Sequence, residues 1–271
     1  MNKNDAQKLC KTALSDLKEQ LEEGKSESVQ RLLMAMALFH DYSFHNVMMI
    51  VSQRPDATHV AGIRTWNRLN RFVKKGEKGI AIFAPMIFKN GEEQKRDRQG
   101  ESSSISFRVV HVFDISQTEG EPLPETVTVT GDPAAYLERL RLAVTNRGIA
   151  LLYEDDLGPA LGRSSGGTIK LVKGLTPAEE YSVLAHEFGH ELLHHGPNRG
   201  ETPKERRELE AESVAFILCR YAGLECSTSH TDYIHVFGGD PHTLGDSFDI
   251  VQRTASDIIE AMTVEPKALA A

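Results

Sequence analysis

Apolar residues recur at helical spacing in a stretch that begins at Thr176, at positions Val183, Leu184, Phe188, Leu192 and Leu193. Thr176 is a good N-cap residue, Pro177 suits the first helical position, and Glu179 completes a capping box. Gly196 and the proline after it end the pattern. We therefore expect a helix near residues 177–195.

A second helical pattern follows in residues 204–218, where the apolar positions are Leu209, Val214, Phe216 and Ile217. The charged residues at its start suit a solvated face with ion pairs four residues apart. Further helices are expected over 4–23, 27–39, 43–54, 62–71, 133–147, 230–236 and 245–262, and strands over 80–84, 106–115 and 166–172. Residues 90–104 are charged and rich in Gly and Ser, which predicts a loop.

The elements predict an α+β fold, and a chain of 271 residues suits one large or two modest domains. Pro122 to Gly131 has the composition of a linker, so we place the domains at 1–124 and 125–271. The net charge of −8 is unevenly spread, because residues 1–125 carry 18 basic and 17 acidic residues and the rest carry 13 and 22. Two parts with different partners are therefore expected.

Three cysteines, an odd number without a C-x-x-C pair, indicate reduced thiols and a cytoplasmic setting. The polar N-terminus lacks the apolar segment of a signal peptide. The longest apolar run, Leu32 to Phe39, is too short to span a bilayer, so no membrane partner is expected.

The first of the two helices contains the pattern H-E-x-x-H at His186, Glu187 and His190. Residues four apart share a helix face, so both imidazoles can bind one Zn²⁺ while Glu187 acts as general base. This favours a metal-dependent hydrolase, and a peptidase in particular. The alternative is a pair of histidines on an ordinary amphipathic helix.

A zinc hydrolase of this kind needs a third protein ligand. Glu208 and Glu212 lie four apart on the second helix, so we assign Glu208 as the third ligand and Glu212 as the carboxylate that orients a ligand histidine. Glu210 is the competing candidate. Two imidazoles and a carboxylate accept Zn²⁺, but also Mn²⁺ or another divalent ion.

Other residues near the motif have open roles. The strand at 166–172 is either an ordinary strand or an edge that pairs with an extended peptide substrate. His194 and His195 either contact the metal site or end the helix, where positive charge is favourable. One of four downstream residues is a candidate for oxyanion stabilisation: His230, Tyr233, His235 and His242.

Seven basic residues lie between Gly62 and Lys89, with Glu77 as the single acid. Aromatic residues Trp66, Phe72, Phe83 and Phe88 are interleaved with them. Bases stack on aromatic rings while phosphates contact Lys and Arg, so the segment suits single-stranded DNA. The candidates are Arg64, Trp66, Arg68, Arg71, Lys74, Lys75 and Lys78. The alternative is a solvated basic face over an aromatic core.

Four short segments of the first half resemble the N-terminal domain of ArdC-type antirestriction proteins: Y-S-F-H-N-V at 42–47, W-N at 66–67, V-K-K-G-E-K-G at 73–79 and V-F-D-I-S-Q-T-E-G at 112–120. Residues 186–190 and 208–212 resemble the zincin-like metallopeptidase domain of the same proteins, which is related in pattern to ImmA/IrrE-type peptidases. The resemblance implies an N-terminal domain that binds single-stranded DNA and a C-terminal domain that holds a metal. It also implies carriage on plasmids or other mobile elements and protection of incoming DNA from restriction.

Overall fold

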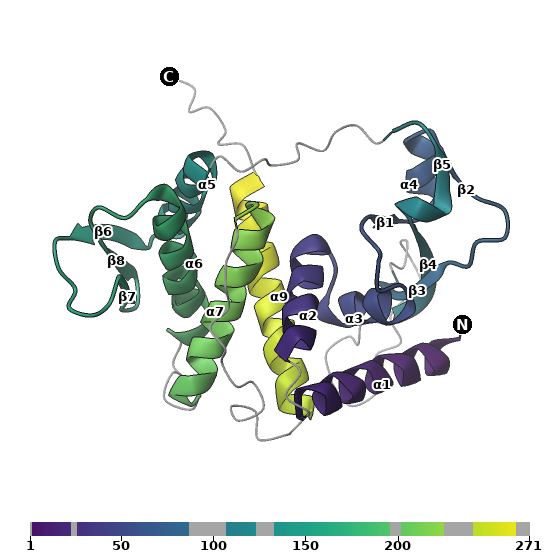
Figure 1. Cartoon of the computed structure of the whole chain (residues 1–271), viewed down its shortest axis with the longest axis horizontal. Helices are drawn as coiled ribbons and strands as arrows, with labels where there is room; N and C mark the ends of the chain where they lie inside the picture. Colours follow the sequence, from purple (N-terminus) through teal and green to yellow (C-terminus); the bar gives the residue numbers. More distant parts are fainter. Residues whose placement is uncertain are drawn as a thin grey trace, which may run out of the picture. The chain divides into compact units, whose positions relative to one another are not determined.

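A computed structural model describes residues 2–22, 26–86, 107–122, 133–195, 202–224 and 241–263, which combine helices and short strands in an α+β fold (Figure 1). The expected loop at 90–104, nearly all of the expected linker and the expected helix at 230–236 lie outside these residues. No described helix is both long enough and apolar enough to cross a membrane.

The chain forms two compact units. Unit 1 contains Met1–Ala13 and Met48–Leu123, and unit 2 contains Leu14–Val47 and Pro124–Ala271. One boundary between the units lies after Leu123. In addition, residues 14–47 belong to the same unit as the C-terminal half of the chain. The unit boundaries fall within helices α1 (Lys3–Glu22) and α3 (Phe44–Gln53).

Unit 1 is built on two small antiparallel sheets. The first has the order β1-β4-β3 and the second pairs β2 with β5. Their bounds, with those of the helix α4 and the 3-10 helix η1, are β1 Val60–Ala61, α4 Ile63–Arg68, β2 Arg71–Val73, β3 Ile80–Pro85, β4 Phe107–Asp114, η1 Ile115–Gln117 and β5 Thr118–Gly120. Ile80 pairs with Val112 at one end of the β3–β4 ladder, so their buried side chains extend the core of the unit.

A buried carboxylate, Asp114, organises the turn after β4. Its Oδ2 accepts hydrogen bonds from the backbone N–H groups of Thr58 and His59, and its Oδ1 caps η1 by accepting from Ser116 N–H. The Gln117 amide donates to Glu77 Oε2 and to the Lys78 carbonyl. The two segments V-K-K-G-E-K-G and V-F-D-I-S-Q-T-E-G are therefore joined by hydrogen bonds between their polar side chains and backbone.

Unit 2 combines a three-stranded sheet with helices. Its described elements are α2 Ser26–Leu38, α5 Pro133–Asn146, β6 Ala150–Glu154, β7 Gly162–Ser164, β8 Thr168–Val172, α6 Pro177–His194, α7 Lys204–Tyr221 and α9 Pro241–Thr263. The sheet order is β6-β8-β7, with β6 parallel and β7 antiparallel to β8. The idea that the strand at 166–172 offers its edge to a peptide is therefore wrong, because β8 is paired on both sides.

Helix α7 is the central helix of unit 2. It contacts α6, α9 and α2, and within unit 2 Figure 1 shows the sheet, α6, α7 and α9 in successive layers. Nearly all side chains from Leu209 to Cys219 are buried, the exception being Glu212, because neighbours cover α7 on several sides. A helix in this position holds its charged residues at fixed places, since it has little freedom to rotate.

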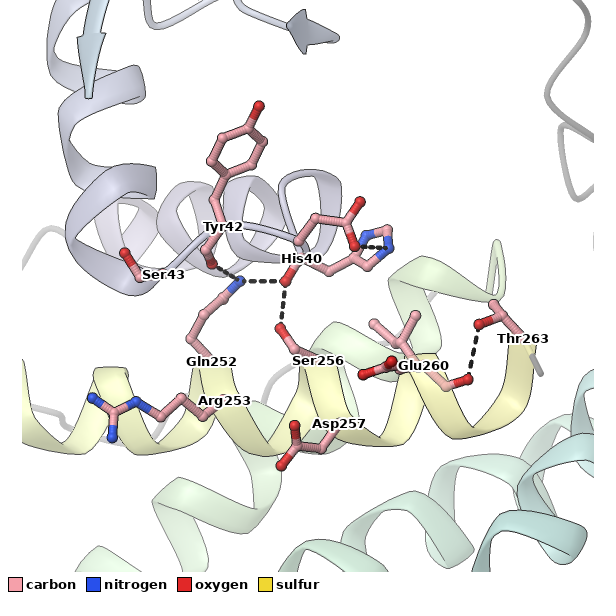
Figure 2. Close-up of a pocket in the computed structure, with 11 residues that line it drawn as sticks. His40, Tyr42, Ser43, Gln252, Arg253, Ser256, Asp257, Glu260 and Thr263 are labelled. Atoms are coloured by element: carbon pink, nitrogen blue, oxygen red, sulfur yellow. Dashed lines mark hydrogen bonds and ion pairs between the residues drawn. The ribbon is translucent and has the colours of Figure 1, made fainter. Parts of the chain in front are cut away.

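Residues 14–47 join unit 2 because polar contacts connect the end of α2 to α9. The Gln252 side-chain amide donates to the carbonyls of His40 and Tyr42, and Ser256 Oγ donates to the His40 carbonyl (Figure 2). A pocket of about 520 Å³ lies beside these contacts, between the turn after α2 and α9. Among the described residues, the cluster of candidate metal ligands lies elsewhere, on α6 and α7.

Candidate metal centre and nucleic-acid surface

Helices α6 and α7 bring three candidate ligand atoms together. His190 Nε2 lies 3.0 Å from His186 Nε2 and 3.3 Å from Glu208 Oε2. His186 Nε2 lies 3.5 Å from the same Glu208 oxygen. The three atoms therefore form a nearly equilateral triangle, to which two residues of one helix and one of the next contribute.

The triangle fits a tetrahedral divalent ion. Zn–N and Zn–O bonds of about 2.0–2.1 Å place neighbouring tetrahedral ligand atoms about 3.3 Å apart. The observed separations of 3.0, 3.3 and 3.5 Å bracket that value. A triangle of protein ligands occupies three corners of a tetrahedron and leaves the fourth for water or substrate.

A glycine on α6 allows α7 to approach closely enough for this geometry. A Cβ added to Gly189 would lie only 3.3 Å from Ala211 Cα, so the two helix backbones nearly touch there. Glu208 precedes Ala211 by one turn, on the side of α7 that faces the two histidines. The pairing of a glycine with an alanine thus brings a carboxylate from the second helix within reach of the first.

The environment of the two candidate ligand histidines favours their neutral form. Burial lowers the pKa of His186 below its ordinary value, although the negative charges of Glu208 and Glu212 oppose the shift. Burial, together with the neighbouring His186, lowers the pKa of His190 to about 4. Only neutral imidazole offers a lone pair to a cation, so these shifts favour metal binding at neutral pH.

Glu187 lies beside the triangle and is buried. Burial and the nearby charge of Glu208 raise the pKa of Glu187 to about 7, and hydrogen bonds from Ser164 partly offset the rise. A carboxylate with a pKa near the working pH is well suited to accept and return a proton. Its contact with Ser164 also places this group next to strand β7.

Strand β7 approaches α6 closely because Gly162 has no side chain. A Cβ at this position would lie 2.7 Å from Glu187 Cγ and 2.6 Å from Val183 Cγ1. Real Cβ atoms do not approach other atoms so closely, so either the strand or the Glu187 side chain would have to move. Gly162 therefore fixes the distance between the edge strand and the candidate general base.

We expect Gly162→Ala to displace Glu187 without disturbing the metal ligands. A misplacement of about 1 Å costs about 10²-fold in rate, so peptide cleavage should fall by roughly that factor. Metal affinity, measured by titration, should stay within a few-fold of wild type because the atoms nearest to the added methyl group belong to Val183 and Glu187, which are not ligands of the triangle. Gly174→Ala is not a matched control, although a Cβ at Gly174 would meet no other atom. The φ of Gly174 is +87°, which alanine rarely adopts, so backbone strain would add to the effect of the methyl group. Ser165→Ala is preferable, and an equal loss of cleavage there would contradict the prediction.

The turn between β7 and β8 is fixed to α6 by Glu191. Its carboxylate accepts three backbone hydrogen bonds of 2.8–3.0 Å, from the N–H groups of Ser165, Gly166 and Gly167. His195 Nε2 lies 3.4 Å from Glu191 and 3.1 Å from Ser164 Oγ. Glu191 and His195 thus hold β7 in place, a role that the sequence motif did not indicate.

Three acidic residues of α7 have different positions. Glu208 faces the histidine pair, whereas Glu210 is buried on another side of the helix, where it contacts His194, Arg206 and Ser247. Of the two candidates for third ligand, only Glu208 lies in the triangle. Glu212 acts on His186 through its charge. The hydrogen-bond partner of the remaining nitrogen of His190 is His194, with 3.0 Å between the two Nδ1 atoms.

The candidates for oxyanion stabilisation are not placed by the structure. His230, Tyr233 and His235 lie outside the described residues, and His242 lies in α9 at a position whose side chain is not described.

The basic residues in this segment of unit 1 are of two kinds. Some have exposed side chains, and Arg71 forms hydrogen bonds within the unit. Exposed basic side chains lie on α4 and on the turn between β2 and β3, at Arg64, Arg68, Lys74, Lys75 and Lys78. Arg71 instead donates to Thr118 Oγ1 and to the carbonyls of Thr118, Gly120 and Glu121, which joins β2 to β5. Its guanidinium therefore has a structural role, which the sequence did not indicate.

Trp66 is not available for base stacking, so its assignment as a DNA-binding residue is wrong. The side chain is 2% exposed, and its indole N–H donates to the Phe113 carbonyl at 2.9 Å. Phe72 on β2 is 56% exposed. In the sequence it lies between the exposed basic residues of α4 and those of the turn after β2. Phe72 is therefore an exposed aromatic side chain of the basic segment, and its exposure follows from alternation along a short strand.

Comparison with known families gives two matches along the chain. Residues 7–113 match the N-terminal domain of the anti-restriction factor ArdC, and residues 144–222 match the IrrE N-terminal-like domain. An uncharacterized protein of Bacillus anthracis is 26% identical over 282 aligned positions that cover 87% of this chain. The chain spans 48% of that protein's length.

Two solved structures share the fold over nearly the whole chain. The metal-free crystal structure of the antirestriction protein ArdC from plasmid R388 is 18% identical, with a TM-score of 0.55, and covers 96% of this chain and 99% of its own. The Mn(II)-bound structure of the same protein is 17% identical, with a TM-score of 0.58, and covers 95% and 99%. The chain therefore contains a segment that matches the ArdC N-terminal domain, followed by a segment that matches the IrrE N-terminal-like domain, and it shares the fold of ArdC.

Proposed function

We propose that this protein is a metal-dependent peptidase joined to a domain that binds single-stranded DNA, and that it acts in antirestriction. The observation that carries the peptidase half is the triangle of His186, His190 and Glu208 beside the buried Glu187. Its dimensions suit a divalent ion, and the Mn(II)-bound ArdC structure shares the fold. Zn²⁺ is the ion we favour, with Mn²⁺ the main alternative.

The residues around the triangle provide the groups that peptide hydrolysis needs. A divalent ion held by the three ligands would lower the pKa of a water molecule and polarise a carbonyl. Glu187 accepts the proton of the attacking water and then donates it to the leaving amine. Ser164 orients Glu187 through its hydrogen bonds, and Glu191 holds the strand that carries Ser164.

Strand β7 is the proposed docking edge for a peptide. It is an edge strand of the β6-β8-β7 sheet, and Gly162 places it against Glu187. An extended peptide that pairs with β7 would therefore pass next to the general base and the metal ligands. This assigns to β7 the role that the sequence suggested for residues 166–172.

The peptidase proposal is tested with the full chain, first stripped of metal and then loaded with Zn²⁺ or Mn²⁺. Each sample is incubated with a diverse peptide library, and new termini are identified by mass spectrometry. We expect new termini only in a metal-loaded sample. Metal binding without any cleavage would overturn the peptidase activity while leaving the metal centre in place.

Single-stranded DNA is the proposed partner of unit 1. The proposal is supported by the match to the ArdC N-terminal domain and by the exposed ring of Phe72. It is also supported by exposed basic residues on the helix before Phe72 and in the turn after it, at Arg64, Arg68, Lys75 and Lys78. Phosphates would contact the basic side chains and one base would stack on the ring. Release of counterions would make the affinity fall as salt rises.

We expect Phe72→Ala to weaken binding of a fluorescent single-stranded oligonucleotide by about 1–3 kcal/mol, the contribution of one stacked base. Arg64→Ala should weaken it less and reduce its salt dependence, because one phosphate contact is lost. Leu142→Ala removes a similarly exposed apolar side chain on α5 and serves as the control. Unchanged affinity in Phe72→Ala, measured by fluorescence anisotropy at two salt concentrations, would exclude stacking at this position.

Two other functions fit the same residues and differ in their consequences. A protein that only shields DNA needs unit 1, so Glu187→Gln would keep full protection of DNA against a restriction enzyme. A peptidase that cleaves a regulatory protein needs only unit 2 and predicts no oligonucleotide binding at physiological salt. The exposed basic residues that precede and follow Phe72 in the chain favour DNA binding over the second alternative.

A further inference from the structure

Beyond the ligand triangle, a chain of buried hydrogen bonds leads away from His190. His190 Nδ1 lies 3.0 Å from His194 Nδ1, and His194 Nε2 lies 3.0 Å from Glu210 Oε2. The other oxygen of Glu210 accepts from Arg206 Nε at 2.8 Å and from Ser247 Oγ at 2.5 Å. The chain therefore runs from α6 through α7 to α9.

This chain fixes where each imidazole proton lies. Glu210 is paired with Arg206 and therefore accepts, so His194 donates from Nε2 and has its lone pair on Nδ1. That lone pair accepts the Nδ1 proton of His190. His190 then has its own lone pair on Nε2, the atom that faces His186 and Glu208.

Burial makes the arrangement rigid. The side chains of His194 and Glu210 are 4% and 6% exposed, so water competes little for their hydrogen bonds. Arg206 and Ser247 approach one Glu210 oxygen and His194 approaches the other, which holds the carboxylate from both sides. A ring fixed in this way loses little freedom when it binds an ion.

We propose that His194 and Glu210 are positioning residues that prepare His190 to bind the metal, by selecting its tautomer and fixing its ring. The inference rests on the proposed metal centre and deepens it. Hydrogen-bond partners of ligand histidines contribute about 10–100-fold to metal affinity in other proteins. A merely structural role for His194 would instead affect stability and leave the tautomer of His190 unchanged.

Two substitutions of His194 separate these roles. His194→Phe keeps the ring volume but removes both nitrogens, so we expect about 10–100-fold weaker metal affinity. His194→Asn places an amide oxygen near the position of Nδ1, so it should restore part of that loss. Affinities are measured with the purified full chain by competition between Zn²⁺ or Mn²⁺ and a chromogenic chelator. Circular dichroism and thermal unfolding verify that each variant is folded.

The metal-free protein provides a second readout that does not depend on a variant. Nitrogen-15 NMR of the wild-type histidines should show His190 with its proton on Nδ1. Finding the proton on Nε2 would overturn the inference, as would a folded His194→Phe protein that binds metal as tightly as wild type. Unchanged affinity in His194→Phe would leave the proposed metal centre itself in place. A wild-type chain that binds neither ion would refute the metal centre itself.

Glu210→Gln extends the test to the end of the chain. The amide has the same shape as the carboxylate but a weaker acceptor, so metal affinity should fall by a smaller factor than in His194→Phe. Glu205→Gln, at an exposed position of the same helix, is the matched control. Equal affinities in the two glutamine variants would remove Glu210 from the proposed chain.

Discussion

Replacing Glu187 by glutamine should lower the rate of peptide cleavage by about 10²–10⁴-fold, the usual contribution of a general base. The amide keeps the size and shape of the side chain but cannot accept the proton of the attacking water. The three ligand atoms do not include Glu187, so metal affinity should stay within a few-fold of wild type. Cleavage is followed with a peptide that the metal-loaded wild type cuts.

A matched control for this variant is Glu205→Gln, which removes an exposed carboxylate of α7 that does not belong to the ligand triangle. Binding of single-stranded DNA should be unchanged in both variants because the proposed DNA surface belongs to unit 1. Cleavage at the wild-type rate in Glu187→Gln would exclude Glu187 as the base. Full DNA protection in that variant would indicate that antirestriction does not require peptide cleavage.

The histidine pair and its helix were predictable because every signal is local. The N-cap at Thr176, the capping box with Glu179 and the spacing of His186 and His190 all lie within one helix, and α6 has this cap and these bounds. The expected helices at 4–23, 27–39 and 133–147 are also present as α1, α2 and α5. Local periodicity was sufficient for these elements, because each is longer than three turns.

The choice between Glu208 and Glu210 was not settled by sequence. Both lie on one helix, and only the rotation of α7 against α6 decides which of them faces the histidines. That rotation depends on the close approach of Gly189 to Ala211 and on the neighbours of α7. The same tertiary packing places His194 between His190 and Glu210, so its role could not be read from the motif.

Residues in short strands were also missed, for a different reason. Strands β1, β2, β5 and β7 have two or three residues each, too few to show an alternating pattern. Without β2 and its partner, the exposure of Phe72 and the internal hydrogen bonds of Arg71 were not evident. Trp66 was misassigned because burial depends on β4, where the distant Phe113 carbonyl accepts its indole proton.

Removing one ligand of the triangle should have the largest effect on metal binding. We expect His186→Phe to reduce affinity by more than the 10–100-fold typical of the hydrogen-bond partners of ligands, because a direct metal bond is lost. An ion present at a concentration about 100 times its Kd raises the free energy of unfolding by about 2.7 kcal/mol. An ion present at a concentration equal to its Kd raises it by only about 0.4 kcal/mol. At the same ion concentration, the metal-induced rise in Tm should therefore nearly disappear in the variant. Glu205→Gln is the control, since Glu205 is an exposed residue of α7 that does not belong to the triangle. If His186→Phe kept the full rise in Tm, the ion would be bound at another place and His186 would not be a ligand.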